Sequence, residues 1–469
     1  MSFTEFDLNE GILKAIEKQG YTEPTEIQQR AIPILLDGER DFVGQAQTGT
    51  GKTAAFVLPL LQKLDPKNGS VQALILVPTR ELANQVFNEI QKLGEFSKIK
   101  ALAIYGGSSY EKQKSSLRKD KPQIIVGTPG RVMDLLKQRS LKLNNSNYFI
   151  LDEADEMLNM GFFEDVQKIL ESFNDEKRMW MFSATMPRAI MNLIKNDFKN
   201  PEVVALKKKT MTNSDIEQKY YLVKIKNQKE ALCRLLDVDP DMYGIIFCRT
   251  RLETKEVAEE LLMRGYPVET LSGELAQAQR DEAMRKFKSK RVKLLVCTDV
   301  AARGLDINNL THVINYGLPQ DMESYVHRIG RTGRAGLKGI AITIVDPRHS
   351  GMIRRIESFV KSPIELCKLP GIQALKTSLV SRELEKMNLV LDAVRGNGEN
   401  FKVDQAYELF KEKFEDLTPE ELLKFTFVWS FNKKIKRYNN VGKIDEEPSA
   451  RRSSGSNSDF GSRRRRDRG

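Results

Sequence analysis

The chain has 469 residues, of which 40% are hydrophobic and 30% are charged, enough apolar material for more than one globular core. Lysine and arginine number 75 against 64 aspartates and glutamates, so the net charge is +11. No apolar run approaches the ~18 residues of a transmembrane helix, and the acidic N-terminus lacks the apolar segment of a secretory signal. We therefore expect a cytoplasmic protein without a membrane partner.

Cysteine and histidine are sparse. The four cysteines, at positions 233, 248, 297 and 367, include no closely spaced pair, and the three histidines are scattered. This spacing excludes a disulfide scaffold and the usual zinc-binding patterns.

Short apolar segments alternate with helical stretches in the first half of the chain. The expected strands are 73–77, 123–126, 148–151 and 179–182. Each is apolar on both faces, as a parallel sheet covered by helices on both sides requires. Because a turn and a helix follow most of them, the pattern predicts βαβ units, whose ligands bind beyond the carboxyl ends of the strands.

A second alternation follows a lysine-rich stretch at 207–214. Its expected strands are 219–223, 244–248, 293–297, 312–315 and 339–345, after which residues 365–436 have a helical pattern without strands. We predict a first lobe at 1–206, a linker at 207–216, a second lobe at 217–365, a helical extension at 366–440 and a tail at 441–469.

The tail is rich in arginine, serine and glycine. From Arg451 onward, seven arginines face two aspartates, which gives this segment a net charge of +5. It lacks apolar residues to bury, so we predict disorder. It is either a solvated solubility tail or an electrostatic attachment to nucleic acid, and we favour the second.

A phosphate-binding loop is the sharpest local signal. Its residues are Ala46, Gln47, Thr48, Gly49, Thr50, Gly51, Lys52 and Thr53. Glycines let backbone N–H groups surround phosphate oxygens, Lys52 can neutralise the β- and γ-phosphates, and the Thr53 hydroxyl can reach Mg²⁺. Ala46 stands where the general P-loop pattern has glycine.

Two adjacent acids, Asp152 and Glu153, end the strand expected at 148–151. Burying both beside the phosphate loop is costly without cations. Asp152 as a Mg²⁺ ligand and Glu153 as the base for an attacking water account for both acids. An acidic helix N-cap, the alternative, would need only one of them.

With the residues around them, these motifs resemble the DEAD-box family of ATP-dependent RNA helicases, most of all its bacterial cold-shock type. The resemblance runs from about residue 3 to 345, and Ala46 is the usual residue of this family. The segments that carry it are 20–28, 46–53, 78–82, 106–107, 128–131, 152–155, 183–185, 277–280, 298–306 and 327–334.

The resemblance implies two tandem RecA-like lobes, ATP and Mg²⁺, and roles for individual residues. Tyr21 would stack on adenine, Gln28 would hydrogen-bond it, and Gly304 and Asp306 would contact the nucleotide from the second lobe. Arg331 and Arg334 would be arginine fingers on the γ-phosphate, and Ser183, Thr185, Asp155 and His327 would couple ATP to RNA. The RNA backbone would be contacted by Thr79, Arg80, Gly107, Thr128, Arg131, Arg280 and Thr298.

Without the resemblance, several of these residues have ordinary interpretations. Gln28 is a polar residue near a helix, the arginines near 331 form a solvated face, and Ser183 and Thr185 are turn hydroxyls. Thr25 caps a helix in either interpretation.

The implied mechanism couples ATP binding to lobe closure on RNA. ATP and single-stranded RNA both favour the closed state, which bends one strand and breaks a few base pairs. Hydrolysis to ADP and phosphate reopens the lobes. The sequence thus predicts RNA-stimulated ATP hydrolysis with local strand separation, in RNA metabolism and the stress response.

Three alternatives have to be weighed. A DNA helicase or translocase could share both lobes, although the adenine-reading segment and Asp155 favour the RNA family. A non-enzymatic RNA-binding scaffold is disfavoured because Lys52, Glu153 and both finger arginines are present. An ATP-driven RNA clamp or ribonucleoprotein remodeller would carry the same motifs.

The helical extension occupies the place of a dimerisation region in the cold-shock type. Either it mediates a homodimer or it is an appendage packed on the second lobe, and the sequence leaves both open. Ribosome-assembly or RNA-decay machinery as a partner follows only from analogy with the family.

Overall fold

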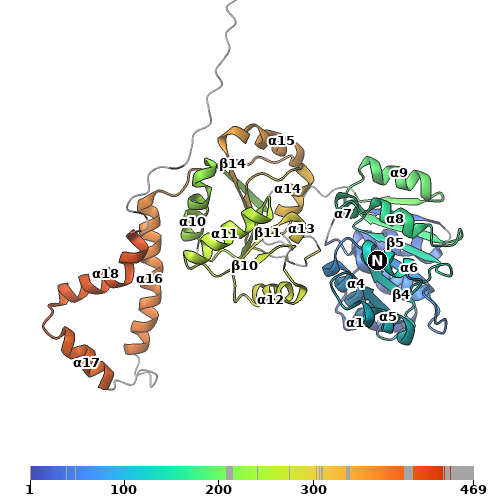
Figure 1. The fold of residues 1–469 in the computed structure, drawn as a ribbon, viewed down its shortest axis with the longest axis horizontal. Coiled ribbons are helices and arrows are strands. Elements are labelled where there is room, and N and C mark those ends of the chain that lie inside the picture. The colour runs from blue at the N-terminus through green and yellow to red at the C-terminus, as the bar shows by residue number, and fades with distance from the viewer. Residues whose placement is uncertain are drawn as a thin grey trace, which may run out of the picture.

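The structure is a computed structural model that describes residues 2–38, 40–47, 49–206, 215–239, 241–273, 275–302, 304–305, 307, 310–333, 338–395, 405–436, 438 and 444. Two α/β lobes lie next to each other, and a set of long helices projects from the second lobe on the side away from the first (Figure 1). The expected tail at 441–469 lies outside the described residues except for Ile444, and so does most of the expected linker, 207–214.

The first lobe is built on a seven-stranded parallel sheet with the order β3-β4-β2-β5-β6-β1-β7. Its strands are β1 (Phe42–Gln45), β2 (Ala73–Leu76), β3 (Ala101–Ile104), β4 (Ile124–Gly127), β5 (Tyr148–Asp152), β6 (Arg178–Ser183) and β7 (Glu202–Ala205). In register, Phe42 of β1 lies opposite Trp180 of β6, and Ile150 of β5 lies opposite Ile75 of β2.

The second lobe repeats this topology. Its strands are β8 (Ile216–Leu222), β9 (Gly244–Cys248), β10 (Val268–Leu271), β11 (Leu294–Thr298), β12 (His312–Tyr316), β13 (Gly339–Val345) and β14 (Glu365–Leu366). The order β10-β11-β9-β12-β13-β8-β14 is the first order with each strand replaced by its counterpart. The two lobes therefore share one architecture, which confirms the expected pair of similar parallel α/β units.

Helices cover both faces of each sheet (Figure 1). In the first lobe they are η1 (Phe3–Glu5), α1 (Glu10–Lys18), α2 (Glu26–Asp37), α3 (Lys52–Lys63), α4 (Arg80–Leu93), α5 (Tyr110–Asp120), α6 (Pro129–Lys137), α7 (Ala154–Asn159), α8 (Phe163–Leu170) and α9 (Arg188–Asp197). In the second they are η2 (Ile225–Asn227), α10 (Gln228–Val238), α11 (Arg251–Met263), α12 (Gln277–Lys288), α13 (Asp299–Ala302), α14 (Met322–Ile329), η3 (Pro347–His349) and α15 (Gly351–Val360). Side-chain oxygens of Asn9, Thr79 and Ser109 accept backbone N–H groups and so begin α1, α4 and α5.

Alternate residues along the inner strands of the first sheet enter different cores. On β5, Ile150 packs in the core that contains Phe56 and Trp180, whereas Phe149 and Leu151 pack in the core that contains Met181. Both faces of the strand are therefore buried, which is the physical reason that these strands are continuous apolar runs.

The strands that the sequence did not single out are short or mixed in composition. β1 contains a glycine and ends in a glutamine, β3 alternates alanine with larger residues, and β7 begins with a glutamate. The expectation that 365–436 lacks strands was wrong at its start, because Glu365 and Leu366 form β14 and extend the second sheet by pairing with β8.

The helical extension consists of α16 (Ile372–Arg395), α17 (Gln405–Phe414) and α18 (Pro419–Lys436). Its base packs on the second lobe through a small core of Leu375, Leu379 and Tyr438. The Tyr438 hydroxyl donates to Asp237 at the end of α10, and Ser378 Oγ donates to the Asp237 carbonyl at 3.3 Å. Among the described residues, no helix is long and apolar enough to cross a membrane.

Candidate active site between the lobes

The phosphate loop connects the carboxyl end of β1 to α3. Gly49 and Gly51 have φ values of 83° and 89°, which side-chain-bearing residues rarely adopt, so the loop can turn tightly into the helix. Lys52 is buried, and its ammonium donates to the Ala46 carbonyl at 3.0 Å. The Thr50 hydroxyl donates to the Gln47 carbonyl at 2.7 Å, and Thr53 lies in the first turn of α3. The lysine thus lies folded against the loop that would hold the phosphates.

Gln28 on α2 contacts this loop directly. Its Nε2 donates to the Gly51 carbonyl at 3.1 Å, and its Oε1 accepts the Thr25 N–H at 2.9 Å, which makes Thr25 the N-cap of α2, as expected. A side-chain amide has a second N–H and a second lone pair, so Gln28 can keep both contacts and still bind a base.

Asp152 and Glu153 lie where β5 meets α7. Asp152 is buried, and burial raises the pKa of its carboxyl, although the nearby Lys52 ammonium opposes the shift. Burial, with the charges of Asp152 and Glu156, raises the pKa of Glu153 to about 7 against the opposing charges of Lys52 and Arg331. The two acids, the lysine and the second-lobe arginine therefore influence one another electrostatically, as one site requires.

Glu153 has φ 54° and ψ 49°, a left-handed conformation that glycine would adopt without strain. For a glutamate this backbone costs about 1–3 kcal/mol and persists only where the surrounding structure fixes it. Such strain is concentrated at functional sites, and here it lies at the residue that follows the buried Asp152 in the chain.

Asp155, Ser183 and Thr185 form one hydrogen-bonded unit. Asp155 Oδ2 accepts both the N–H and the hydroxyl of Thr185, each at 2.8 Å. The Ser183 hydroxyl accepts the Asp155 N–H at 3.3 Å and donates to the Thr185 carbonyl at 2.7 Å. The structure thus joins α7, which follows the acid pair, to the end of β6.

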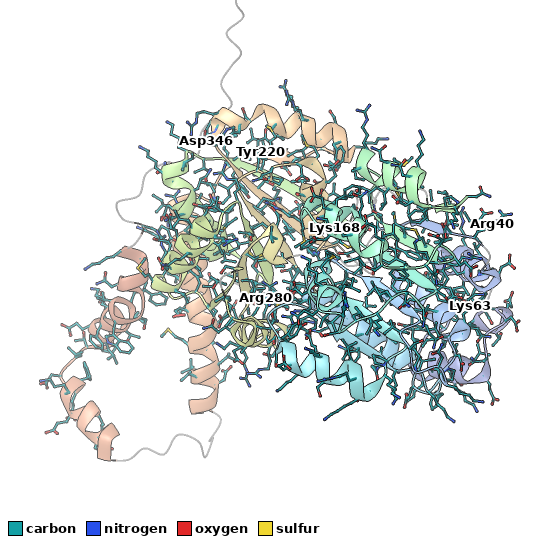
Figure 2. All side chains as sticks on the ribbon, turned by 45° about the vertical axis from the view of Figure 1, so that its right-hand side comes forward. Arg40, Lys63, Lys168, Tyr220, Arg280 and Asp346 are labelled. Atoms are coloured by element: carbon teal, nitrogen blue, oxygen red, sulfur yellow. The ribbon has the colours of Figure 1, made fainter. Side chains whose placement is uncertain are left out.

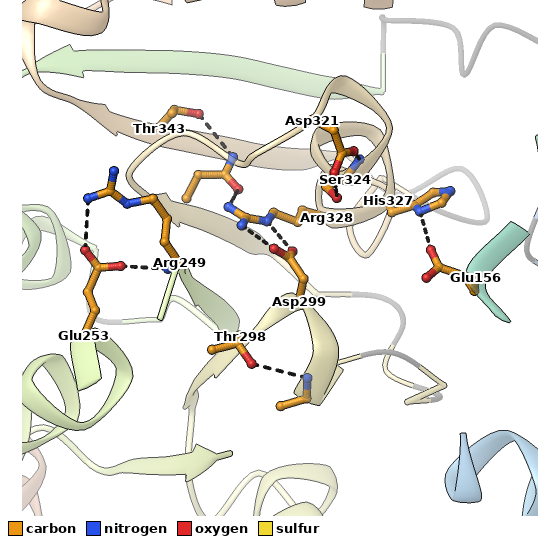
Figure 3. Close-up of polar contacts among 12 residues, drawn as sticks. Glu156, Arg249, Glu253, Thr298, Asp299, Asp321, Ser324, His327, Arg328 and Thr343 are labelled. Carbon is orange, nitrogen blue, oxygen red and sulfur yellow. Dashed lines mark hydrogen bonds and ion pairs between the residues drawn. The ribbon is translucent and has the colours of Figure 1, made fainter. Parts of the chain in front are cut away.

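Two arginines at the end of α14 have different environments. Arg328 is almost fully buried, donates to both oxygens of Asp299 at 2.6 and 2.7 Å and donates to Asn315 at 3.1 Å (Figure 3). Arg331 is only partly buried and donates to the Leu305 carbonyl at 2.8 Å. The hydrogen bonds of Arg328 are therefore made within the second lobe. Arg331, in contrast, is near enough to Glu153 to lower the pKa of that carboxyl.

His327 reaches across the cleft. Its Nδ1 lies 3.1 Å from Oε1 of Glu156, on α7 of the first lobe (Figure 3). Burial alone would lower the pKa of His327, but the hydrogen bond and charge of Glu156, with the charges of Asp155 and Glu153, raise it. This pair connects the second lobe to the helix that follows the acid pair.

The first-lobe candidates for RNA binding lie at helix starts and in one glycine turn. Thr79 and Thr128 are the N-cap residues of α4 and α6. Gly107 has φ 84°, and a side chain there would overlap the guanidinium of Arg80. Arg131 donates to Gln113 at 2.9 Å, and its guanidinium lies 5.4 Å from the Tyr110 ring centroid.

A second set of cross-cleft contacts joins α4 to the second lobe. Arg280 on α12, labelled in Figure 2, donates to Glu81 at 2.6 Å and to the Ala301 carbonyl at 2.7 Å. Arg80 donates to Gln277 at 3.3 Å. Two of the expected RNA-binding arginines therefore contact residues of the opposite lobe in this structure.

Gly304 approaches the start of α4 closely. Its carbonyl accepts the amide of Gln85 at 2.8 Å, and a Cβ at Gly304 would lie 1.8 Å from the Thr79 hydroxyl. Only glycine fits here while the lobes are in contact. Thr298, at the end of β11, accepts the Ala301 N–H at 3.4 Å and begins the turn into α13.

Tyr21 lies between α1 and α2, with its ring stacked against Phe3 at a centroid distance of 6.3 Å. Its side chain is 36% exposed, so part of the ring is open to a ligand. Its hydroxyl donates to Glu89 on α4.

Comparison with known proteins identifies the family. One family model, DEAD/DEAH box helicase, matches residues 25–193, and another, helicase conserved C-terminal domain, matches residues 227–336. The ATP-dependent RNA helicase CshA of Listeria monocytogenes is 49% identical over 368 residues, which make up 78% of this chain and 70% of the relative. The DEAD-box ATP-dependent RNA helicase CshA of Bacillus subtilis is 44% identical over 412 residues, 88% of this chain and 82% of the relative. The chain belongs to the DEAD-box family of ATP-dependent RNA helicases.

A solved structure agrees with this assignment. Saccharomyces cerevisiae Dbp5 bound to RNA and ADP BeF3 is similar to this DEAD-box helicase over 81% of the chain and 99% of its own, with a TM-score of 0.71 and 33% identity. The fold class and the ATP-dependent RNA helicase activity expected from the sequence are thereby confirmed.

The structure of this DEAD-box helicase does not describe every expected site residue, and it also shows contact residues that the sequence analysis did not predict. Thr48, Asp306 and Arg334 are not among the described residues. The cross-cleft partners Glu81, Gln85, Glu156 and Gln277 were not singled out as site residues, because an acid or amide on a helix gives no local signal of what it faces. Their positions inside or just after recognisable motifs were the only available indication.

Proposed function

We propose that this DEAD-box helicase uses the cleft between its lobes to couple ATP hydrolysis to clamping and local separation of RNA strands. One observation supports this coupling above all. His327 of the second lobe contacts Glu156, close to the proposed catalytic acids, and Arg280 of the second lobe contacts Glu81, next to the proposed RNA contact Arg80. A ligand that draws the lobes together at one side would therefore favour binding at the other.

For the nucleotide, we propose that Tyr21 stacks on adenine and Gln28 hydrogen-bonds its edge. Backbone N–H groups of 46–53 would surround the phosphates, and Lys52 would leave the Ala46 carbonyl to bind them. Gly304 and Asp306 would complete the pocket from the second lobe. The direct contact between Gln28 and Gly51 supports this arrangement, because it places the base reader against the phosphate loop.

The residues also fit a bound Mg²⁺. This ion is held through one or two carboxylates together with substrate phosphates and waters, so a cage of three acids is not required. Asp152 and the Thr53 hydroxyl would hold it. Burial raises the pKa of Asp152 against the opposing charge of Lys52, so a bound cation would further stabilise its ionised form. When bound, the ion neutralises charge on the β- and γ-phosphates.

For the chemical step, we propose Glu153 as the general base. Its carboxylate would take a proton from the attacking water as the water oxygen bonds to the γ-phosphorus and the bond to the β–γ bridging oxygen breaks. Arg331 and Arg334 would stabilise the charge on the transferring phosphoryl group. Because Glu153 and Arg331 belong to different lobes, hydrolysis would require closure.

For RNA, we propose backbone contacts by Thr79, Arg80, Gly107, Thr128, Arg131, Arg280 and Thr298. Hydroxyls, a glycine and arginines suit phosphates and 2′-hydroxyls rather than base edges, so binding by the lobes would be independent of sequence. Ser183, Thr185, Asp155 and His327 would transmit the nucleotide state, and their shared hydrogen bonds with α7 support this role.

The decisive experiment measures ATP hydrolysis with RNA and with DNA of the same sequence. Strong stimulation by RNA alone, abolished by Glu153→Gln, supports the proposal. Equal stimulation by DNA would favour a DNA translocase, and hydrolysis indifferent to RNA would contradict the coupling residues. A second experiment compares the separation of an RNA duplex with stable, ATP-dependent binding to RNA. Duplex separation would indicate an unwinding enzyme, whereas stable binding without separation would indicate a clamp or ribonucleoprotein remodeller.

We also propose the chain division 1–206, 207–216, 217–365, 366–440 and 441–469 for lobe 1, linker, lobe 2, extension and tail. The two sheets, which span residues 42–205 and 216–366, support the boundaries at 206, 217 and 365 to within one residue. Rapid proteolysis after 206 and after 440 would be the expected pattern.

The helical extension is proposed to form a homodimer. Its described residues expose many large apolar side chains, among them Trp429 at 79% and Leu423 at 71%; the others are Leu384, Met387, Leu389, Val390, Leu391, Leu417, Leu422, Phe425, Phe427 and Val428. Patches of this kind on a folded protein mark an interaction surface. By sequence, α18 begins with Glu420 and Glu421 and ends with Lys436, so two antiparallel copies would align opposite charges.

Light scattering of the full chain tests this proposal. Trp429→Glu would convert a dimer to a monomer, whereas Leu262→Glu, at an exposed position on α11 of the second lobe, would leave the mass unchanged.

We further propose that the protein is cytoplasmic, in keeping with its four free cysteines. We propose that it acts in ribosome assembly or RNA decay and in the stress response.

A further inference from the structure

One face of α4 carries three polar contacts at a spacing of four residues. Glu81 accepts Arg280 of α12, Gln85 donates to the Gly304 carbonyl, and Glu89 accepts the hydroxyl of Tyr21. In an α-helix, residues four apart lie on the same side and are separated by about 6 Å along the axis. This side of α4 therefore contacts the second lobe at its beginning and the Tyr21 ring near its end.

The Tyr21 contact differs from an ordinary surface hydrogen bond. One face of the ring stacks on Phe3, which is buried, and the chain around Tyr21 is fixed by a hydrogen bond from its N–H to the Ile16 carbonyl at 3.2 Å. Burial and the Glu89 carboxylate raise the pKa of Tyr21, so the phenol stays protonated and remains a donor. Tyr21 is thus held by one main-chain contact and two contacts of its side chain, and of these three only the Glu89 contact comes from α4.

We infer that Glu89 is a positioning residue that sets the Tyr21 ring for stacking on the ATP base, through the same helix that carries the cross-cleft contacts. This inference rests on the proposed role of Tyr21. A phenol without this acceptor can rotate away from its Phe3-stacked orientation, and a stacking surface that must first be ordered binds its base more weakly.

The test uses the full chain and measures hydrolysis of ATP at saturating RNA. Glu89→Leu and Tyr21→Phe each remove the hydrogen bond, and we expect each to raise the KM for ATP roughly tenfold, with a much smaller change in kcat. Because both variants remove one interaction, the double variant should be no worse than either alone. Glu89→Gln keeps an acceptor oxygen and should recover most of the affinity.

Two controls separate positioning from general damage to the protein. Inorganic triphosphate has no base, so its inhibition constant should be the same for wild type and Glu89→Leu. Glu95→Leu removes an acid that lies just beyond α4 and pairs with Lys18 at 2.7 Å, and its KM for ATP should be that of wild type.

The outcomes distinguish the inference from the function on which it rests. An unchanged KM in Glu89→Leu, additive effects in the double variant, or an equal loss of triphosphate binding would each overturn the inference. If Tyr21→Ala does not weaken ATP binding, measured with a fluorescent ATP analogue, the proposed stacking role of Tyr21 fails instead.

Discussion

Arg280 of the second lobe and Glu81 of the first form an ion pair of 2.6 Å across the cleft, with both side chains largely shielded from water. Arg280 is also a proposed RNA contact. The same guanidinium connects the lobes in this structure and, if it binds a phosphate as proposed, would link closure to RNA binding.

Glu81→Gln should weaken this connection. The neutral amide cannot form the charge-assisted bond, and we expect the strengthening of RNA binding by ATP to fall about tenfold, a typical size for such coupling. The measurement compares RNA affinity with and without a non-hydrolysable ATP analogue. Glu164→Gln, which removes an exposed pair with Lys168 at 3.7 Å, is the matched control.

The charge-swapped variant Glu81→Arg with Arg280→Glu provides a second check. If the pair acts through lobe contact, the swap should restore closure in the absence of RNA, as measured by energy transfer between dyes on the two lobes, but not RNA affinity. Restored RNA affinity would contradict a direct role of Arg280 at phosphates.

The contact between His327 and Glu156 should make closure depend on pH. The pKa of His327 is raised above its ordinary 6.5 when the lobes are in contact, so the paired state binds the proton more tightly than the separated state. Its stabilising contribution is fully present below 6.5 and is lost as the pH rises through the raised value.

Energy transfer between the lobes across this pH range checks the prediction. Glu156→Gln removes the carboxylate that contributes most to raising the pKa of His327. In this variant the change of energy transfer with pH should therefore be smaller and its midpoint should lie at lower pH. A pH dependence that survives unchanged in His327→Gln would assign it to another group.

Arg328 should matter for stability rather than for chemistry. Its nearly fully buried guanidinium donates to both oxygens of the partly exposed Asp299 carboxylate, and losing these bonds should cost about 1–3 kcal/mol. Urea unfolding of Arg328→Met should show this loss. Normal unfolding with lost ATP hydrolysis would instead place Arg328 among the catalytic groups.

Tyr438 should anchor the helical extension. Its buried hydroxyl donates to Asp237, which also accepts Tyr266 at 2.7 Å, so Tyr438→Phe should loosen the base of α16 by about 1–3 kcal/mol. Faster hydrogen exchange in α16, with unchanged exchange in the first lobe, is the expected result. Tyr110→Phe, which loses a more exposed bond to Gln138, is the control.

The fold class predicted from the amino-acid sequence is confirmed, and most of the chemistry proposed for the first lobe was also predicted from the sequence. Phosphate binding and strand burial each require particular residues at neighbouring positions, so both leave local patterns in the sequence. These patterns are the strands that are apolar on both faces, the loop at 46–53 and the two acids where β5 ends. The resemblance to the DEAD-box family added residues such as Gln28, whose local sequence gives no sign of its contact with Gly51.

The tertiary structure decided which residues meet across the cleft. Glu81, Gln85 and Glu156 look like ordinary solvated helix residues in the sequence, and the arginines near 331 look alike. Packing within the second lobe buries Arg328 against Asp299, whereas contact between the lobes brings Arg280 to Glu81 and brings Arg331 near enough to Glu153 to lower the pKa of that carboxyl. Partners separated by about 200 residues are fixed by how two sheets and their helices pack, which no local spacing in the chain encodes.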